Sequence, residues 1–94
     1  MLPVRYAKLA QRDLERIRDY HADVDAALAI VVVDRIVRAA RVLQHVPEGG
    51  PTTILGDRRK WRVPRTRYVI YYRVLGYEVR ILRIVHGSRA LAVP

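Results

Sequence analysis

Residues 68–85 read YVIYYRVLGYEVRILRIV, and this stretch decides the fold. Tyrosine, valine and isoleucine, which favour strands, fill both of its halves. Gly76 and Tyr77 lie between the halves and favour a tight hairpin turn. The stretch therefore predicts two antiparallel strands, over 68–75 and 78–85.

A third strand is predicted just upstream. Lys60-Trp61-Arg62-Val63 alternates basic and apolar residues. Because side chains alternate between the two faces of a strand, Trp61 and Val63 are expected to face the core and Lys60 and Arg62 the opposite side. Residues 64–66, Pro-Arg-Thr, are typical of a turn, so the three strands form a meander.

The region before the meander shows helical periodicity instead. Residues 8–21 are predicted to form a helix with one face made of residues spaced by four, three and four: Ala10, Leu14, Ile17 and His21. Asp13, Arg16 and Tyr20 are expected on another face.

A second helix is predicted from an N-cap at Asp23 to about Val46, where Pro47 and a glycine pair end it. Four consecutive β-branched residues, 30–33, favour a strand instead. The longer pattern decides for a helix, because a polar and an apolar stripe run side by side at helical spacing. The polar stripe comprises Asp34, Arg38, Arg41 and His45, and the apolar stripe comprises Ala29, Val33, Ile36, Ala40 and Leu43.

These elements, with a short strand over 2–6, give the order β-α-α-β-β-β. The predicted fold class is α+β, a helical hairpin packed on one face of a small, mostly antiparallel sheet. The chain has 94 residues, of which 51% are hydrophobic, so we expect one small core and a single domain over 1–94.

The net charge of +9 lies entirely in the later part of the chain. Residues 1–57 hold eight Lys or Arg and eight Asp or Glu, whereas residues 58–94 hold ten Lys or Arg and one carboxylate, Glu78. Six of the ten residues over 58–67 are basic. Such asymmetry indicates an anionic partner, either nucleic acid or an acidic protein segment, and a solvated basic surface is the alternative.

Composition disfavours several classes of protein. There is no cysteine for a disulfide framework or a cysteine-rich zinc site, no signal peptide is indicated, and no apolar run approaches the roughly 20 residues of a membrane span. We therefore expect a cytoplasmic protein. The histidines, His21, His45 and His86, are spaced too widely for a metal motif, and no catalytic triad or phosphate-binding loop is indicated. No cofactor is expected.

The arginines leave metal-independent RNA cleavage as one possible chemistry, because it needs a base, a proton donor and cations at the phosphate. Lys60, Arg62 and Arg89 are the candidate cations, with a lysine as base. Tyrosines of the 68–75 strand are candidate proton donors, but their apolar surroundings suit a place in the core equally: Tyr68, Tyr71 and Tyr72. The basic half supplies no pair of carboxylates for acid–base work.

The ending ILRIVHGSRAL (81–91) resembles that of the RelE/ParE superfamily of toxins from bacterial type II toxin–antitoxin systems. AKLAQRDLERIRDYHAD (7–23) resembles the first helix of that superfamily, with the pattern A-x-x-D-L-x-x-I at residues 10–17. LQHVPEGG (43–50) and RYVIYYRV (67–74) resemble the end of its second helix and its central strand. The resemblance covers nearly the whole chain, in order, and agrees with the order of elements above.

The superfamily divides by target. RelE-like members resemble ribonucleases that cut mRNA in the ribosomal A site, whereas ParE-like members poison DNA gyrase. Lys60, Arg62 and Arg89 match the basic positions of the RelE-like group, but Val69 stands where that group has an arginine, and no tyrosine follows Tyr77. The resemblance therefore favours a ParE-like gyrase inhibitor, which is not an enzyme, with a RelE-like ribosome-dependent mRNA endoribonuclease as the alternative.

The resemblance also implies a cognate antitoxin whose acidic or amphipathic C-terminal segment binds this chain in a hetero-oligomer. The helix predicted to end near Val46 is then expected to offer a groove for an antitoxin helix. Eight basic residues are expected to bind the antitoxin or the target, which is gyrase, or the ribosome and mRNA under the alternative. They are Arg58, Arg59, Lys60, Arg62, Arg65, Arg67, Arg83 and Arg89.

Overall fold

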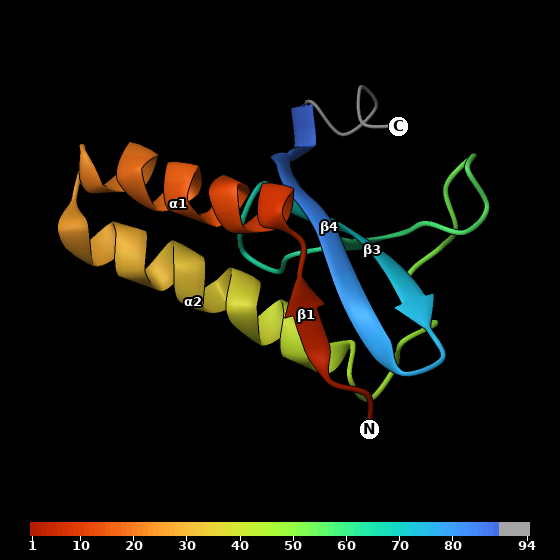
Figure 1. The fold of residues 1–94 in the computed structure, drawn as a ribbon. Coiled ribbons are helices and arrows are strands. Elements are labelled where there is room, and N and C mark those ends of the chain that lie inside the picture. The colour runs from red at the N-terminus through yellow and green to blue at the C-terminus, as the bar shows by residue number, and fades with distance from the viewer. Residues whose placement is uncertain (89–94) are drawn as a thin grey trace.

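The computed structural model describes residues 1–88, which form two helices and four strands. Their order is β1 (Val4–Tyr6), α1 (Lys8–Ala22), α2 (Ala26–Val42), β2 (Arg59–Arg62), β3 (Tyr68–Leu75) and β4 (Glu78–His86) (Figure 1). The predicted β-α-α-β-β-β order and the α+β class are confirmed.

The four strands form one sheet in the order β1-β4-β3-β2. β2, β3 and β4 make an antiparallel meander, and β1 pairs with β4 in parallel. The prediction of a mostly antiparallel sheet is therefore confirmed. Since β4 lies between β1 and β3, the last of the described strands is an interior strand of the sheet.

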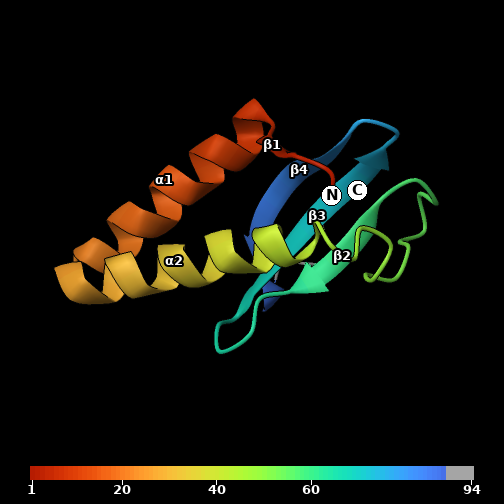
Figure 2. The ribbon, with the colours of Figure 1, turned by 90° about the horizontal axis from the view of Figure 1, so that it is seen from below.

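The two helices lie side by side on one face of the sheet (Figure 2). Alternate residues of β3, namely Tyr68, Ile70 and Tyr72, point into the core between the two layers. Val63 is buried there and Trp61 packs against it, as their alternation with basic residues predicted. No helix of residues 1–88 packs on the other face of the sheet, which we call the outer face.

The start of α2 corrects one detail of the sequence prediction. Asp25, not Asp23, is the N-cap, and its carboxylate accepts hydrogen bonds from the backbone N–H groups of Ala27 and Leu28. The reason is backbone conformation: Asp25 is extended, with φ −163° and ψ 118°, as a cap requires, whereas Asp23 still has helical angles at the end of α1. α2 ends at Val42, before the predicted end, because turns replace the helix over residues 43–45.

The β-branched run over 30–33 is helical, as the longer periodicity predicted. Most of the predicted apolar stripe is buried, but Val33 is only half-buried while Val32 and Ala39 are buried. The buried stripe is wider than predicted because α2 packs against α1 as well as against the sheet.

Candidate functional site

The outer face of the sheet has a small apolar centre surrounded by basic residues. Val69, Tyr71 and Val85 form a cluster of buried residues there. On β2, Lys60 lies opposite Tyr71 and Arg62 lies opposite Val69. The alternation of β2 therefore places both cations beside this cluster, and both are exposed, as predicted.

A hollow of about 280 Å³ lies beside β2. Its lining combines the two exposed cations with apolar side chains: Pro51, Lys60, Trp61, Arg62, Val69 and Gly87. Among residues 1–88, no carboxylate forms an ion pair with Lys60 or Arg62. The hollow thus offers positive charge without an acid–base pair.

The β2–β3 turn, residues 63–67, is fixed by its own side chain and backbone. The Thr66 hydroxyl donates to the carbonyl of Val63 at 2.9 Å and accepts the N–H of Tyr68 at 3.1 Å. The Thr66 N–H also bonds to the Val63 carbonyl at 3.3 Å. These three hydrogen bonds give the tip of the hairpin one defined conformation.

Two arginines project from this turn, and their backbones are held from both sides. Arg65 has a φ of 62°, the left-handed region that arginine rarely adopts. Its carbonyl accepts a hydrogen bond from the guanidinium of Arg35 on α2 at 3.1 Å. The carbonyl of Arg67 accepts the N–H of Gly87 at the end of β4. Both arginine side chains are exposed.

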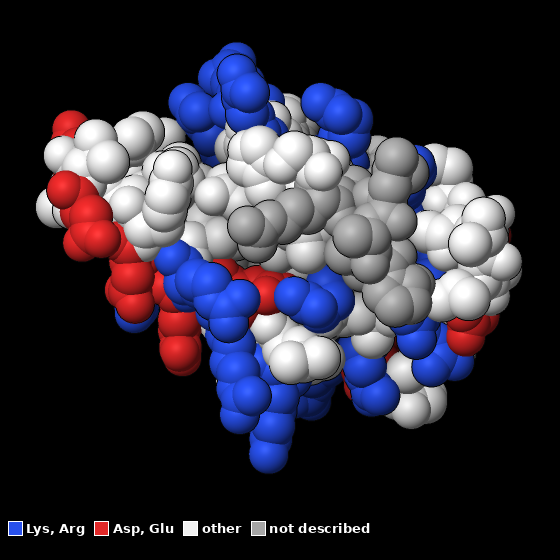
Figure 3. Space-filling view, turned by 90° about the horizontal axis from the view of Figure 1, so that it is seen from above, with Lys and Arg blue, Asp and Glu red and all other residues white. Residues whose placement is uncertain are grey.

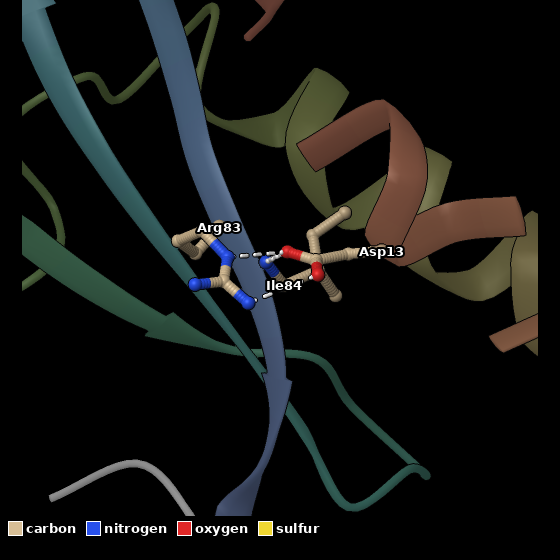
Figure 4. A network of polar contacts seen from close by, with 3 residues as sticks. All are labelled: Asp13, Arg83 and Ile84. Carbon is tan, nitrogen blue, oxygen red and sulfur yellow. Dashed lines mark hydrogen bonds and ion pairs between the residues drawn. The ribbon is translucent and has the colours of Figure 1, made fainter. Parts of the chain in front are cut away.

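Towards the other edge of the sheet, on β4, an arginine forms a partly buried ion pair (Figure 4). Asp13 of α1, which is 5% exposed, reaches β4 and accepts hydrogen bonds from Arg83 Nε at 2.8 Å and Arg83 Nη2 at 3.1 Å. The same carboxylate accepts the Ile84 N–H at 2.9 Å, beyond the point where β1 ends. The hydrogen bond to Asp13 raises the pKa of Arg83, so this cation is held by the fold.

Two further arginines near the β3–β4 hairpin are also paired. Arg80 Nε lies 2.8 Å from the carboxylate of Glu78, which is buried, and this contact raises the pKa of Arg80. Arg73 Nε lies 3.3 Å from the carboxylate of Asp57. Cations on the β4 side of the outer face are therefore largely neutralised by neighbouring acids.

Arg59 has a structural role rather than a free guanidinium. It donates to the carbonyls of Glu48 at 3.2 Å and Gly50 at 2.8 Å, and so ties β2 to the preceding loop. The loop approaches closely: the N–H of Gly50 bonds to the Tyr72 hydroxyl at 3.0 Å, and a Cβ on Gly50 would collide with the carbonyl of Lys60. Gly50 is therefore needed for this approach.

The tyrosines of β3 are buried, in agreement with the core interpretation of the sequence. Burial raises the pKa of Tyr68, Tyr71 and Tyr72. The Tyr72 hydroxyl binds Gly50, and the Tyr68 hydroxyl lies 3.0 Å from His21 Nε2. A buried tyrosine with a raised pKa is a poorer proton donor at neutral pH than an exposed one.

The histidines form local contacts. The ring of His86 packs edge-on against Tyr68, which also contacts His21, and His86 Nδ1 lies 2.8 Å from the Ser88 hydroxyl. No group of three His, Asp or Glu residues within the described part of the chain is arranged to hold a metal ion. Neither helix among residues 1–88 is long and apolar enough to cross a membrane.

The end of the molecule formed by the α1–α2 connection has a different character. Large apolar side chains are exposed there, including Val24 at 77% and Ile30 at 72%: Tyr20, Val24, Leu28, Ile30 and Val31. Acidic side chains gather at the same end, and cations project along both long margins of the molecule (Figure 3). The acids of this connection include Asp19, Asp23 and Asp25.

A sequence model described as the ParE toxin of the type II toxin–antitoxin system parDE matches residues 4–91. This chain belongs to the ParE toxin family. A chain of the chromosomal ParDE system from P. aeruginosa is similar in structure, with a TM-score of 0.82, 26% identity, and coverage of 92% of this chain and 96% of that one. Searches among curated proteins gave no match.

Two more distant structures share the fold of this ParE family member. The toxin–antitoxin complex RelBE2 from Mycobacterium tuberculosis gives a TM-score of 0.65 at 23% identity, covering 90% of this chain and 96% of the other. A conserved hypothetical protein from Helicobacter pylori gives 0.59 at 16% identity, covering 94% and 97%. The resemblance to the RelE/ParE superfamily found in the sequence is confirmed.

The eight predicted site residues fall into three groups in this ParE family fold. Lys60, Arg62, Arg65 and Arg67 are exposed on β2 or its turn. Arg58, Arg59 and Arg83 are held by contacts within the protein. Arg89 lies outside the described residues. The sequence analysis missed Asp13, which it grouped with the polar face of α1, although the family pattern at residues 10–17 contains this aspartate.

Proposed function

We propose that this ParE family toxin arrests growth by inhibiting DNA gyrase in the cytoplasm, and that a cognate antitoxin neutralises it. The observation that supports the proposal is an outer face that exposes positive charge and, within residues 1–88, shows no carboxylate paired with those cations. Lys60 and Arg62 are exposed and form no ion pair with a carboxylate of residues 1–88, and the tyrosines of β3 are buried. Such a face suits binding to an anionic surface better than bond cleavage.

The surroundings of Val69 also support a binding toxin. Val69 is 5% exposed and belongs to the apolar cluster of the outer face. The sequence has this valine where RelE-like toxins are expected to have an arginine, so the centre of the face is apolar where phosphate chemistry needs a cation. The match of the ParE model over residues 4–91 points in the same direction.

The surface has two features that suit an antitoxin. The exposed apolar side chains of the α1–α2 end, such as Leu28 and Val31, suit the apolar face of an amphipathic helix. The unpaired cations of β2 suit an acidic extended segment. An antitoxin that covers both features would occupy the outer face and so block the target.

The test measures DNA supercoiling and mRNA integrity with the same purified protein. We expect gyrase to lose supercoiling activity or to accumulate cleaved DNA complexes, while mRNA on ribosomes stays intact. A Lys60→Gln/Arg62→Gln variant should inhibit less. The matched control, Arg18→Gln/Arg38→Gln, removes the same charge from exposed ion pairs on the helices and should inhibit as the parent does.

A RelE-like ribonuclease is the second candidate, because Lys60 and Arg62 are exposed side by side on the outer face. Normal supercoiling together with cut mRNA in the same assay would refute the gyrase proposal. It would mean that the outer face reaches the scissile phosphate without a tyrosine of β3.

A further inference from the structure

We infer that the β2–β3 turn, residues 63–67, is a phosphate-binding element that contacts the backbone of duplex DNA. The inference rests on the proposed function in one respect, since it assigns the DNA side of a gyrase–DNA target to this turn. The inference assigns DNA to the turn alone. The rest of the basic surface is assigned to protein partners.

The conformation of Arg65 is the first observation. Its φ of 62° costs free energy for any residue with a Cβ, whereas glycine or asparagine occupies this region readily. Within residues 1–88, the Arg65 side chain forms no ion pair, and the hydrogen bond at this residue is made by its carbonyl. Backbone strain that no contact of the side chain explains is found at functional positions. The strain at Arg65 therefore points to a function for its guanidinium.

The second observation is how firmly the turn is held. The carbonyl of Arg65 is bound by Arg35 and the carbonyl of Arg67 by Gly87, so two separate elements fix the backbone of both arginines. Thr66 closes the turn between them. A turn fixed in this way presents its guanidinium groups with less loss of backbone entropy on binding.

The third observation is charge without neutralisation. Within residues 1–88, neither arginine of the turn, Arg65 or Arg67, forms an ion pair with a carboxylate, and neither does Arg35, which binds the turn from α2. In Figure 3 a group of cations projects at the top margin, over the side of the sheet that carries this turn. By contrast, Arg73, Arg80 and Arg83 all have acidic partners.

The turn and the strands that flank it carry no large exposed apolar side chain among the described residues, which favours nucleic acid over protein as the partner. In the described part of the chain, no large apolar residue is exposed between Leu55 and Tyr77. Protein partners are usually held by apolar or aromatic anchors, and single strands by stacking of bases on exposed aromatic rings. Guanidinium groups alone suit phosphates, which they bind through two hydrogen bonds at once. The turn therefore fits the outside of a duplex.

The test is the salt dependence of binding to a 30-base-pair DNA duplex, measured without gyrase. Each phosphate contact adds about 0.9 to the steepness of log K against log salt concentration. We expect the steepness to fall by about one for Arg65→Asn and again by about one when Arg67→Gln is added. Asparagine accepts the left-handed backbone, so the melting temperature of Arg65→Asn should be unchanged or higher.

The matched control is Arg18→Gln, which removes one charge from an exposed pair with Asp19 on α1. It lowers the net charge by the same amount and should leave the steepness unchanged. An equal decrease for Arg18→Gln and Arg65→Asn would overturn the inference, since only overall charge would then matter. So would the absence of duplex binding at about 50 mM salt, where phosphate contacts are strong.

Three further outcomes separate this inference from a general preference for anions and from the proposed function. If polyglutamate competes as well as DNA of equal charge, the turn does not select phosphate and the inference fails. If the parent inhibits gyrase and Arg65→Asn/Arg67→Gln inhibits equally with unchanged duplex binding, the turn inference fails and the toxin proposal stands. If the duplex results are as expected but gyrase is unaffected, the toxin proposal fails instead.

Discussion

The two sides of the sheet use their positive charge in different ways. On the β4 side, Arg83 and Arg80 are paired with buried carboxylates, Asp13 and Glu78. On the β2 side, Lys60, Arg62 and the arginines of the turn have no carboxylate partner among residues 1–88, and neutral hydrogen bonds hold the backbone instead. One side uses its charge for stability, whereas the other keeps its charge available to a partner.

The largest effect is expected at the centre of the paired side. Asp13→Ala removes the acceptor of both Arg83 and the Ile84 N–H, and leaves them without a partner at a largely buried position. We expect a loss of about 3 kcal/mol in the free energy of unfolding, measured by urea denaturation. Asp19→Ala, which breaks an exposed pair, should cost less than about 0.5 kcal/mol. Equal costs for the two variants would remove the distinction between buried and exposed pairs.

The next effect concerns the neutral contacts of the unpaired side. Gly50→Ala would push a Cβ against the Lys60 carbonyl and to 2.7 Å from the Tyr72 hydroxyl. We expect a loss of about 2 kcal/mol, because both neighbours are buried or belong to the backbone. Gly76→Ala is the control, since nothing lies within 4 Å of its added Cβ. A stability of Gly50→Ala equal to that of the control would show that the loop is free to move away from β2.

A smaller effect tests one hydrogen bond at the same place. Tyr72→Phe keeps the ring but removes the acceptor of the Gly50 N–H, which is then buried without a partner. The expected cost is about 1 kcal/mol in thermal or urea unfolding. Tyr77→Phe alters an exposed hydroxyl and should be neutral. No loss in Tyr72→Phe would mean that another acceptor replaces the hydroxyl.

The smallest effect is expected where the charge is unpaired. Lys60→Gln/Arg62→Gln should change the free energy of unfolding by less than about 0.5 kcal/mol, because neither side chain forms an ion pair within residues 1–88. The same denaturation series gives the measurement, with Arg83→Gln as the paired counterpart. A loss greater than that of Arg83→Gln would reverse the comparison between the two sides.

Periodicity in the sequence was enough for the elements but not for their partners. The meander was predicted because alternation at Lys60–Val63 and the Gly76-Tyr77 turn are local signals. The parallel pairing of β1 with β4 has no such signal, since it joins Val4 to Val79 across almost the entire chain. The N-cap of α2 was also misplaced for a local reason. Asp23 and Asp25 are the same residue type, equally suited to cap a helix, and they differ only in their backbone angles.

For the candidate site, the sequence identified the cations but not which of them are available. Arg62 and Arg83 look alike in the sequence, and only the fold shows that Asp13 lies beside one of them. Asp13 was placed by its spacing with Arg16 and Tyr20, on a face of the helix other than the predicted apolar one. Asp13 is buried because it contacts β4. Its partner there, Arg83, lies 70 residues away in the sequence. Long-range pairing of this kind leaves no periodic trace.

The place of β4 inside the sheet has a consequence for the synthesis of the chain. β1 is made before the other elements, yet its strand partner among residues 1–88 is β4, the last of the described strands. The Asp13 carboxylate likewise gains its hydrogen-bond partners only when Arg83 and Ile84 have been made. We therefore expect the sheet to be completed only after β4 has been translated, so that β1 and α1 make these contacts late in folding.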